Sequence, residues 1–351
     1  MIASGDDAAL IASGAVGYSW PLTFHAIAEP QPGPLWQGLF SATWPRYRHW
    51  YLRGGSEARP DLETGRRMLA THMPELVPTW HRLVELAGGG ELPARMLTLY
   101  NPPAYLAGCS QAVHHGGRRG RRPALVRNYD YAPQLLERVV LGTSFTGRKV
   151  VGMSDCLWGL IDGMNDAGLA VSLAFGGRRT VGTGFGIPLV LRYLLEVCDT
   201  AAEARRTLVR LPVHMAYNVT VVDRAGKYFT AYLGPDREPG FSSQRFATNH
   251  QEHPDWPRQA HATHSLERQA VLAGLLAHPI ELEQLAARFL TPPLYSTAYE
   301  MGFGTLYTAL YQPADLAIEY RWPGSTWRHS VRDFSTGQHA VVLGAATQVP
   351  M

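Results

Sequence analysis

The chain has 351 residues, of which 46% are hydrophobic and 17% charged, so it has enough apolar material for a sizeable core. The net charge of +3 is mixed along the chain, which disfavours nucleic acid as a partner. Three scattered cysteines exclude a disulfide framework, and no apolar run reaches membrane-spanning length. The first residues lack the basic start of a signal peptide, so we expect a cytoplasmic protein with no membrane partner.

The N-terminal region divides into two parts by pattern. Residues 17 to about 60 are rich in Trp, Pro, Tyr and Gly without clear periodicity, and we expect them to be irregular or short-stranded. From Asp61 apolar residues recur near helical spacing until the glycines at 88–90. This second part predicts a pair of helices.

From Cys109 onward the pattern predicts β-hairpins separated by helices. Two blocks have helical character, 188–211 with Asp199 as an N-cap candidate, and 265–290. Hairpins in series with paired helices favour stacked antiparallel sheets covered by helices over a parallel sheet. The predicted hairpins join 109–115 to 124–131, 157–164 to 169–175, 217–223 to 227–233, and 305–311 to 316–322.

Cys109 is the candidate nucleophile. A lone cysteine is most often a small buried hydrophobe, and we interpret Cys156 and Cys198 in that way. Cys109 differs because it follows Gly108, opens a predicted strand, and shares its hairpin with Arg127 and Asp130. Those charges are costly in a core unless they are paired, and a guanidinium favours a thiolate.

The sequence leaves two sources for the base that this thiol needs. One is a histidine, with His250 and His264 as the candidates. The other is internal, since cleavage of the Gly108-Cys109 bond would leave Cys109 with a free α-amine, whose pKa of about 7.7 to 8.0 suits a base. Attack of the thiol on the preceding carbonyl would give a thioester that water can open.

Two other features of the first hairpin are weaker candidates for a binding site. The pair His114-His115 is a faint metal motif at the hairpin tip, and we expect no metal. The tip itself is basic and is more often a solvated loop than a site. It could also bind an anionic substrate such as a coenzyme A thioester through its arginines, Arg118, Arg119, Arg121 and Arg122.

Five motifs occur in an order that resembles a known family. They are Gly108-Cys109, "RNYD" at 127–130, "DGMNDAGLAVSLAF" at 162–175, "ATNH" at 247–250 and "SLER" at 265–268. Each is weak alone, but together they resemble the N-terminal nucleophile hydrolases of the choloylglycine hydrolase superfamily, in the branch similar to acyl-coenzyme A:6-aminopenicillanic acid acyltransferase (peptidase C45 type). The likeness spans about residues 68–323, and its upstream part is similar to a propeptide with a helical region and an "LxLYN"-type strand.

The resemblance implies an α+β fold, a four-layer αββα sandwich of two antiparallel sheets flanked by helices. Residues 1–108 would be a helical, propeptide-like segment that becomes a small subunit, and 109–351 the catalytic core. The protein would be a self-processing cysteine amidohydrolase or acyltransferase that transfers an acyl group from a non-peptide amide or thioester to water or an amine. It would use no cofactor, with acyl-coenzyme A possible as substrate, and its two fragments would stay associated.

The resemblance also implies roles for single residues. Cys109 would be the nucleophile, Arg127 would lie against its thiolate, and Asp130 would hold its amine. Asn249 would donate to the oxyanion and Arg268 would complete the charge network. Simpler interpretations are an Arg127-Asp130 ion pair, a turn role for Asn249 and a solvated helix charge at Arg268.

The chain departs from the superfamily at one position. Bile salt hydrolases have an asparagine where this chain has Ala174, so only the backbone amide of Ala174 is expected at the oxyanion, and bile-acid specificity is not supported. We interpret Asp162 and Asn165 mainly as hairpin-shaping residues. Two other functions stay open, an unprocessed Cys-His hydrolase and an inert binding protein on the same scaffold.

Overall fold

A computed structural model describes residues 19–116 and 122–344, and within them the strands form two sheets. The larger has the order β10-β9-β8-β7-β6-β5-β4-β1-β15. Its strands are β1 (Trp20–Ala28), β4 (Val139–Thr143), β5 (Val150–Asp155), β6 (Gly159–Asn165), β7 (Leu169–Phe175), β8 (Tyr217–Asp223), β9 (Tyr228–Leu233), β10 (Gly240–Ser242) and β15 (Gly337–Leu343). All neighbours are antiparallel except β1 and β4.

The smaller sheet has the order β11-β2-β3-β12-β13-β14 and is antiparallel throughout. It faces the larger sheet where β2 and β3 contact β7. Its strands are β2 (Gly108–His114), β3 (Ala124–Tyr131), β11 (Phe246–Ala247), β12 (Gly304–Gln312), β13 (Ala317–Trp322) and β14 (Ser325–Ser330). The four predicted hairpins are therefore confirmed.

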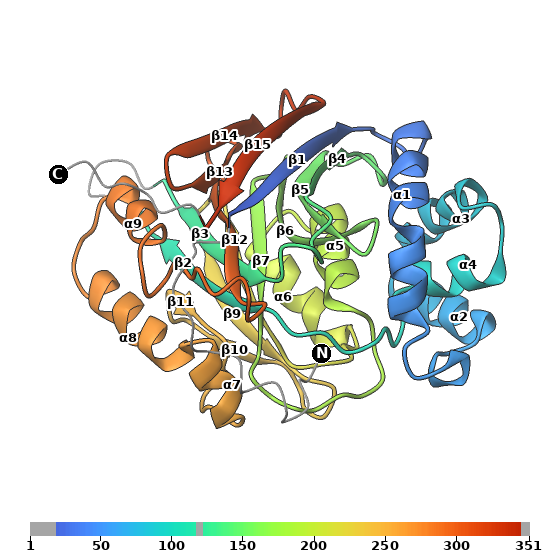
Figure 1. The fold of residues 1–351 in the computed structure, drawn as a ribbon, viewed down its shortest axis with the longest axis horizontal. Coiled ribbons are helices and arrows are strands. Elements are labelled where there is room, and N and C mark those ends of the chain that lie inside the picture. The colour runs from blue at the N-terminus through green and yellow to red at the C-terminus, as the bar shows by residue number, and fades with distance from the viewer. Residues whose placement is uncertain (1–18, 117–121, 345–351) are drawn as a thin grey trace.

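Helices cover the outer face of each sheet (Figure 1). On the larger sheet, α5 (Ile187–Val197) packs against β5, β6 and β7, and α6 (Ala201–Arg210) packs against β8 and β9. On the smaller sheet, Leu272, Leu276 and Leu285 form an apolar cluster with Ala112 and Val126. These leucines belong to the group α7 (Pro257–Ala262), α8 (Ser265–Leu276) and α9 (Leu282–Arg288). The predicted αββα sandwich is confirmed.

The N-terminal helices lie together at one end of the sandwich, opposite α7–α9 in the view of Figure 1. They are α1 (Pro34–Tyr51), α2 (Leu62–His72), α3 (Val77–Leu86) and α4 (Glu91–Leu97), with short 3₁₀ turns at Ser56–Ala58 and Pro74–Leu76. The helices expected from Asp61 are present. The irregular or short-stranded structure expected for residues 17 to about 60 is wrong for α1, a helix of 18 residues, whereas β1 in the same stretch is a strand.

The missed helix α1 has a sequence signal. Its buried side chains are Trp36, Phe40, Tyr47 and Tyr51, whose spacings of four, seven and four put all of them on one helical face. The density of proline and aromatic residues hid this period. Pro34 stands at the start of the helix, where its missing N–H costs nothing.

Two local predictions are also wrong. The "LxLYN"-type strand expected at 97–101 is absent, because α4 ends at Leu97 and the following Leu99 and Asn101 have positive φ values that a strand does not accept. Thr200 rather than Asp199 caps α6, in a capping box with Glu203. Cys156 is buried, as expected, and lies in the tight turn between β5 and β6.

Residues before Gly108 share a core with those after it. Strand β1 pairs with β4 on one side and with β15 on the other, so it closes a gap in the larger sheet. Phe24 of β1 packs on Trp322 with ring centroids 4.9 Å apart. In the described chain, no helix is long and apolar enough to cross a membrane.

Candidate active site

Cys109 lies at the start of β2, fully buried between neighbouring strands. The antiparallel register with β3 puts Gly108 opposite Asp130 and Cys109 opposite Tyr129. On the other side β2 pairs with β11, and the chain leaving β11 brings Asn249 beside Cys109. Pairing alone thus assembles three segments that are far apart in sequence.

Arg127 joins the thiol to the larger sheet. Its Nη2 donates to the Cys109 Sγ at 3.3 Å and to the carbonyl of Leu173 at 2.8 Å. Its Nη1 donates to Asp162 Oδ2 at 2.6 Å, and all of this lies in the core. Arg127 is therefore buried and paired, as a charge in a core must be.

Asp162 is the partner that sequence reasoning missed. It lies within β6 rather than in the hairpin turn, so the turn-shaping role is wrong for Asp162. It also accepts from Tyr307 Oη at 2.5 Å and from Tyr311 Oη. The available signal was an aspartate inside the apolar run "GLIDGM", since such a charge needs a buried partner. Asn165 does lie at the turn, where its Oδ1 accepts from the Leu169 amide at 3.0 Å.

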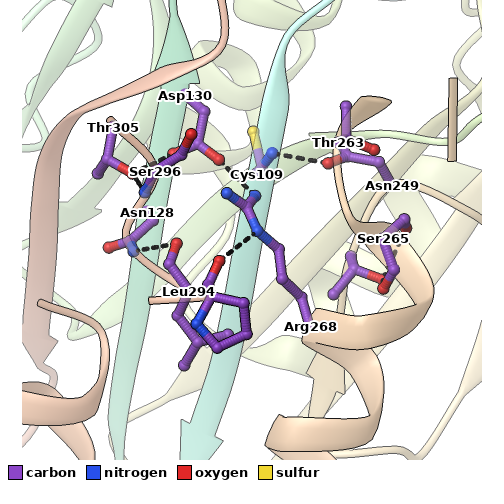
Figure 2. Close-up of polar contacts among 12 residues, drawn as sticks. Cys109, Asn128, Asp130, Asn249, Thr263, Ser265, Arg268, Leu294, Ser296 and Thr305 are labelled. Carbon is purple, nitrogen blue, oxygen red and sulfur yellow. Dashed lines mark hydrogen bonds and ion pairs between the residues drawn. The ribbon is translucent and has the colours of Figure 1, made fainter. Parts of the chain in front are cut away.

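Asp130 and Arg268 form a second buried ion pair (Figure 2). Thr305 Oγ1 donates to the other carboxylate oxygen of Asp130 at 2.6 Å, and Arg268 Nε donates to the carbonyl of Pro293 at 2.9 Å. Arg268, from α8, is 2% exposed and is not a solvated helix charge. Arg127 and Asp130 therefore pair with other residues and not with each other.

The Asn249 side chain spans the Gly108-Cys109 junction (Figure 2). Its Oδ1 accepts from the Cys109 amide at 2.8 Å, which is the N–H of the junction itself. Its Nδ2 donates to the carbonyls of Ala107 and Phe175, each at 3.2 Å. Ala174 lies in β7 opposite Asn218 of β8. Both of its neighbours contact the site: the Leu173 carbonyl accepts from Arg127, and the Phe175 carbonyl accepts from Asn249.

The Cys109 side chain is a neutral thiol and not the thiolate that the neighbouring Arg127 guanidinium was expected to favour. Burial raises the pKa of Cys109 to about 11, and the opposing effect of Arg127 is too small to reverse this. The thiol is thus protonated at neutral pH in the continuous chain. A base is needed to use it as a nucleophile.

Neither candidate histidine contacts the thiol. His250 Nδ1 bonds to Ser265 Oγ at 2.7 Å and its Nε2 to Gln269 Oε1 at 3.0 Å, so both ring nitrogens are engaged elsewhere. His264 is exposed and contacts Glu267 at 3.0 Å. The Cys-His arrangement therefore has no geometric support within the described residues.

The remaining candidates lie away from Cys109. Of the basic tip only Arg122 is among the described residues, and it forms an exposed ion pair with Asp315 at 2.9 Å, whereas Arg118, Arg119 and Arg121 lie outside them. His114 Nε2 contacts the carbonyl of Ile280 at 2.8 Å. No group of three potential ligand side chains in 19–116 or 122–344 could hold a metal ion.

Two stacked, mainly antiparallel sheets between helices, with a cysteine that opens an inner strand, match the arrangement expected of the N-terminal nucleophile hydrolases. The family model of acyl-coenzyme A:6-aminopenicillanic acid acyl-transferase matches residues 117–327, which is more than half of the chain. The chain belongs to this family, and the predicted resemblance is confirmed. The match begins after Cys109, so it does not include the Gly108-Cys109 junction.

Solved structures of low sequence identity are similar to part of this chain. They include penicillin V acylase from Agrobacterium tumefaciens (TM-score 0.44, 14% identity, 63% of this chain and 86% of that one) and the N-acylethanolamine-hydrolyzing acid amidase ortholog of Caenorhabditis elegans (0.42, 14%, 59% and 93%). A third is a conjugated bile acid hydrolase mutant from Clostridium perfringens (0.40, 11%, 66% and 96%). No curated protein matches the sequence. The family assignment depends on the family model alone.

Proposed function

We propose that the protein is a self-processing cysteine amidase or acyltransferase that acts through an acyl-Cys109 intermediate. The observation that supports it most is the clamp on the junction, in which Asn249 holds the Cys109 amide while Arg127 contacts the Cys109 thiol. A cysteine that served only as packing would need neither contact.

Self-processing would begin with attack of the Cys109 sulfur on the Gly108 carbonyl carbon. The new S–C bond replaces the Gly108-Cys109 C–N bond, and the thiol proton passes to the leaving nitrogen. Water then opens the thioester, which frees the Gly108 carboxylate and restores the thiol. The products would be fragments of 108 and 243 residues.

The freed α-amine of Cys109 supplies the base that the continuous chain lacks. Its ordinary pKa of about 7.7 to 8.0 suits proton transfer near neutral pH. Asp130 is near enough to hold it, since an added Cβ on Gly108 would meet Asp130 Oδ2 at 3.3 Å. The Arg268 ion pair holds that carboxylate in place.

Catalysis on a substrate would repeat the same chemistry. The amine takes the thiol proton as sulfur attacks the amide carbonyl, and Asn249 Nδ2 and the backbone amide of Ala174 stabilise the oxyanion. The proton then goes to the leaving amine, which leaves a thioester on Cys109. Water or a second amine takes the acyl group, and no cofactor is required. An acyl-coenzyme A thioester could load Cys109 in the same way.

The test is the intact mass of the purified protein beside Cys109→Ala. We expect the wild type to give two fragments that begin at Met1 and Cys109, and the variant to stay whole. Cys198→Ala is the matched control, since Cys198 is also buried but its sulfur is hydrogen-bonded to Thr207 Oγ1, and this variant should split like the wild type. A whole wild type that still hydrolyses amides would overturn the α-amine mechanism.

A further inference from the structure

A cavity of about 570 Å³ is lined in part by Ala104, Tyr105 and Leu106, the segment that leads into the Gly108-Cys109 junction. Its apolar wall includes Leu106, Met215 and Trp256, and its polar wall includes Arg53, Arg178 and Arg179. That volume is in the range of small-molecule sites, which combine apolar walls with a few polar groups.

The cavity lies on the acyl side of the junction. Leu106 is three residues before Cys109, so their Cα atoms are at most about 11 Å apart. In the thioester formed by self-processing, the acyl group on sulfur is the chain that leads back from Gly108 past Leu106. Arg178 and Arg179 of the lining follow Phe175 in the chain. The Phe175 carbonyl accepts from Asn249 Nδ2, and the Phe175 ring packs edge-on to Trp256 at 6.5 Å.

The three arginines of the cavity differ in how they are paired. Arg178 is occupied, with Asp236 at 2.7 Å and Asp255 at 3.1 Å. Arg179 stacks on the Trp256 ring at 4.6 Å, which uses the face of the guanidinium and leaves its N–H edges free. In residues 19–116 and 122–344, no carboxylate lies within 4 Å of the Arg53 or Arg179 guanidinium.

We propose, on the basis of the function proposed above, that this cavity binds the acyl group of the substrate and that this group carries a carboxylate. The apolar wall would hold the carbon chain, while Arg53 and Arg179 at the exposed rim would bind the carboxylate. A guanidinium edge matches a carboxylate with two parallel hydrogen bonds, which gives preference over an uncharged chain end. The substrate class is therefore an amide of a dicarboxylic acid.

The test compares suberoyl-p-nitroanilide with octanoyl-p-nitroanilide, which differ only in the terminal carboxylate. We expect Arg179→Gln and Arg53→Gln each to raise KM for the suberoyl substrate about tenfold, with kcat and the octanoyl reaction unchanged. Arg179→Lys should recover part of the loss. Arg205→Gln is the matched control, because Arg205 also stacks on a ring, Phe241 at 3.9 Å, outside the cavity.

Equal effects of Arg179→Gln on both substrates, or none, would overturn the inference. Binding by calorimetry separates this outcome from failure of the proposed chemistry, since the cavity exists in the continuous chain. We expect Cys109→Ala to bind the suberoyl compound about tenfold more tightly than the Cys109→Ala, Arg179→Gln double variant. If the wild type cleaves neither substrate but the two variants still differ in affinity, the proposed amide cleavage is wrong and the proposed carboxylate-binding cavity is supported. Equal affinities refute the site.

Discussion

Arg127 and Asp162 form an ion pair of 2.6 Å that joins the smaller sheet to the larger one, with both side chains fully buried. Asp162 balances the guanidinium that lies against the Cys109 thiol, and two tyrosine hydroxyls saturate the carboxylate. Loss of either partner would leave the other as an uncompensated charge in the core.

We therefore expect Asp162→Ala to lower the free energy of unfolding by about 3–5 kcal/mol, the range for breaking a buried pair. Urea denaturation followed by circular dichroism measures this. The control is Asp166→Ala at the nearby turn, whose partly exposed ion pair with Arg148 should be worth no more than about 1 kcal/mol. Equal losses in the two variants would show that the buried pair has no special weight.

Gly108 is in close contact with Asp130. An added Cβ would lie 3.0 Å from Asp130 Cβ, and Asp130 is fixed by Arg268 and Thr305 and so cannot easily yield. We expect Gly108→Ala to lower the free energy of unfolding by about 1–3 kcal/mol and to slow fragment formation. Denaturation and a time course of intact mass measure the two effects.

Gly274 provides the opposite case for comparison. It lies within α8 with nothing within 4 Å of an added Cβ, so Gly274→Ala should stabilise the protein by about 0.5–1 kcal/mol and leave fragment formation unchanged. If Gly108→Ala behaves like Gly274→Ala, the close contact with Asp130 is not limiting.

Asn249 is proposed to stabilise the oxyanion, and loss of one such donor typically costs about 10²- to 10³-fold in rate. We expect that loss in kcat for Asn249→Ala, measured with an amide that the wild type hydrolyses. The control is Asn128→Ala in β3. Asn128 is also buried, but its Nδ2 donates to the carbonyl of Phe289 and to that of Leu294, the latter drawn in Figure 2. We expect Asn128→Ala to lower the free energy of unfolding while kcat stays close to that of the wild type. A full rate in Asn249→Ala would remove it from the mechanism.

Because His214 is buried, we expect the free energy of unfolding to fall in acid. Burial lowers its pKa from 6.5 to about 4, so the stability it contributes is complete above pH 6.5 and is lost as the pH falls to 4. That difference in pKa corresponds to about 3 kcal/mol. Between pH 7 and pH 4.5 the wild type should lose more unfolding free energy than His214→Gln, by urea denaturation at each pH. The exposed His278→Gln should follow the wild type, and an identical pH slope in His214→Gln would contradict the prediction.

If the chain cuts itself, the two fragments should remain together. Strand β1 is hydrogen-bonded to β4 and β15, and Phe24 packs against Trp322 in the shared core. We expect one peak by gel filtration in native buffer and two bands on a denaturing gel. The same sample in urea is the control, and it should separate into two peaks. Separate elution in native buffer would mean that β1 does not hold the fragments together.

Much of the fold could be predicted from local pattern. The hairpins were predictable because alternating apolar runs meet at turn residues such as Asn165 and Gly168, and a strand pair is set by its own neighbourhood. Helix α1 and strand β1 were not, because proline and aromatic residues masked the helical period and β1 pairs only with strands more than a hundred residues away.

For the site, the sequence by itself determined the chemistry available: a cysteine after glycine, Arg127 and Asp130 on the returning strand, and Asn249 and Arg268 in ordered motifs. Only the tertiary structure decided which side chains these residues pair with. It pairs Arg127 with Asp162 and Asp130 with Arg268, and it keeps both histidines away from the thiol. The physical reason is that a buried charge must find its counter-charge across the packed sheets, and which side chains meet there depends on how the sheets stack rather than on spacing along the chain.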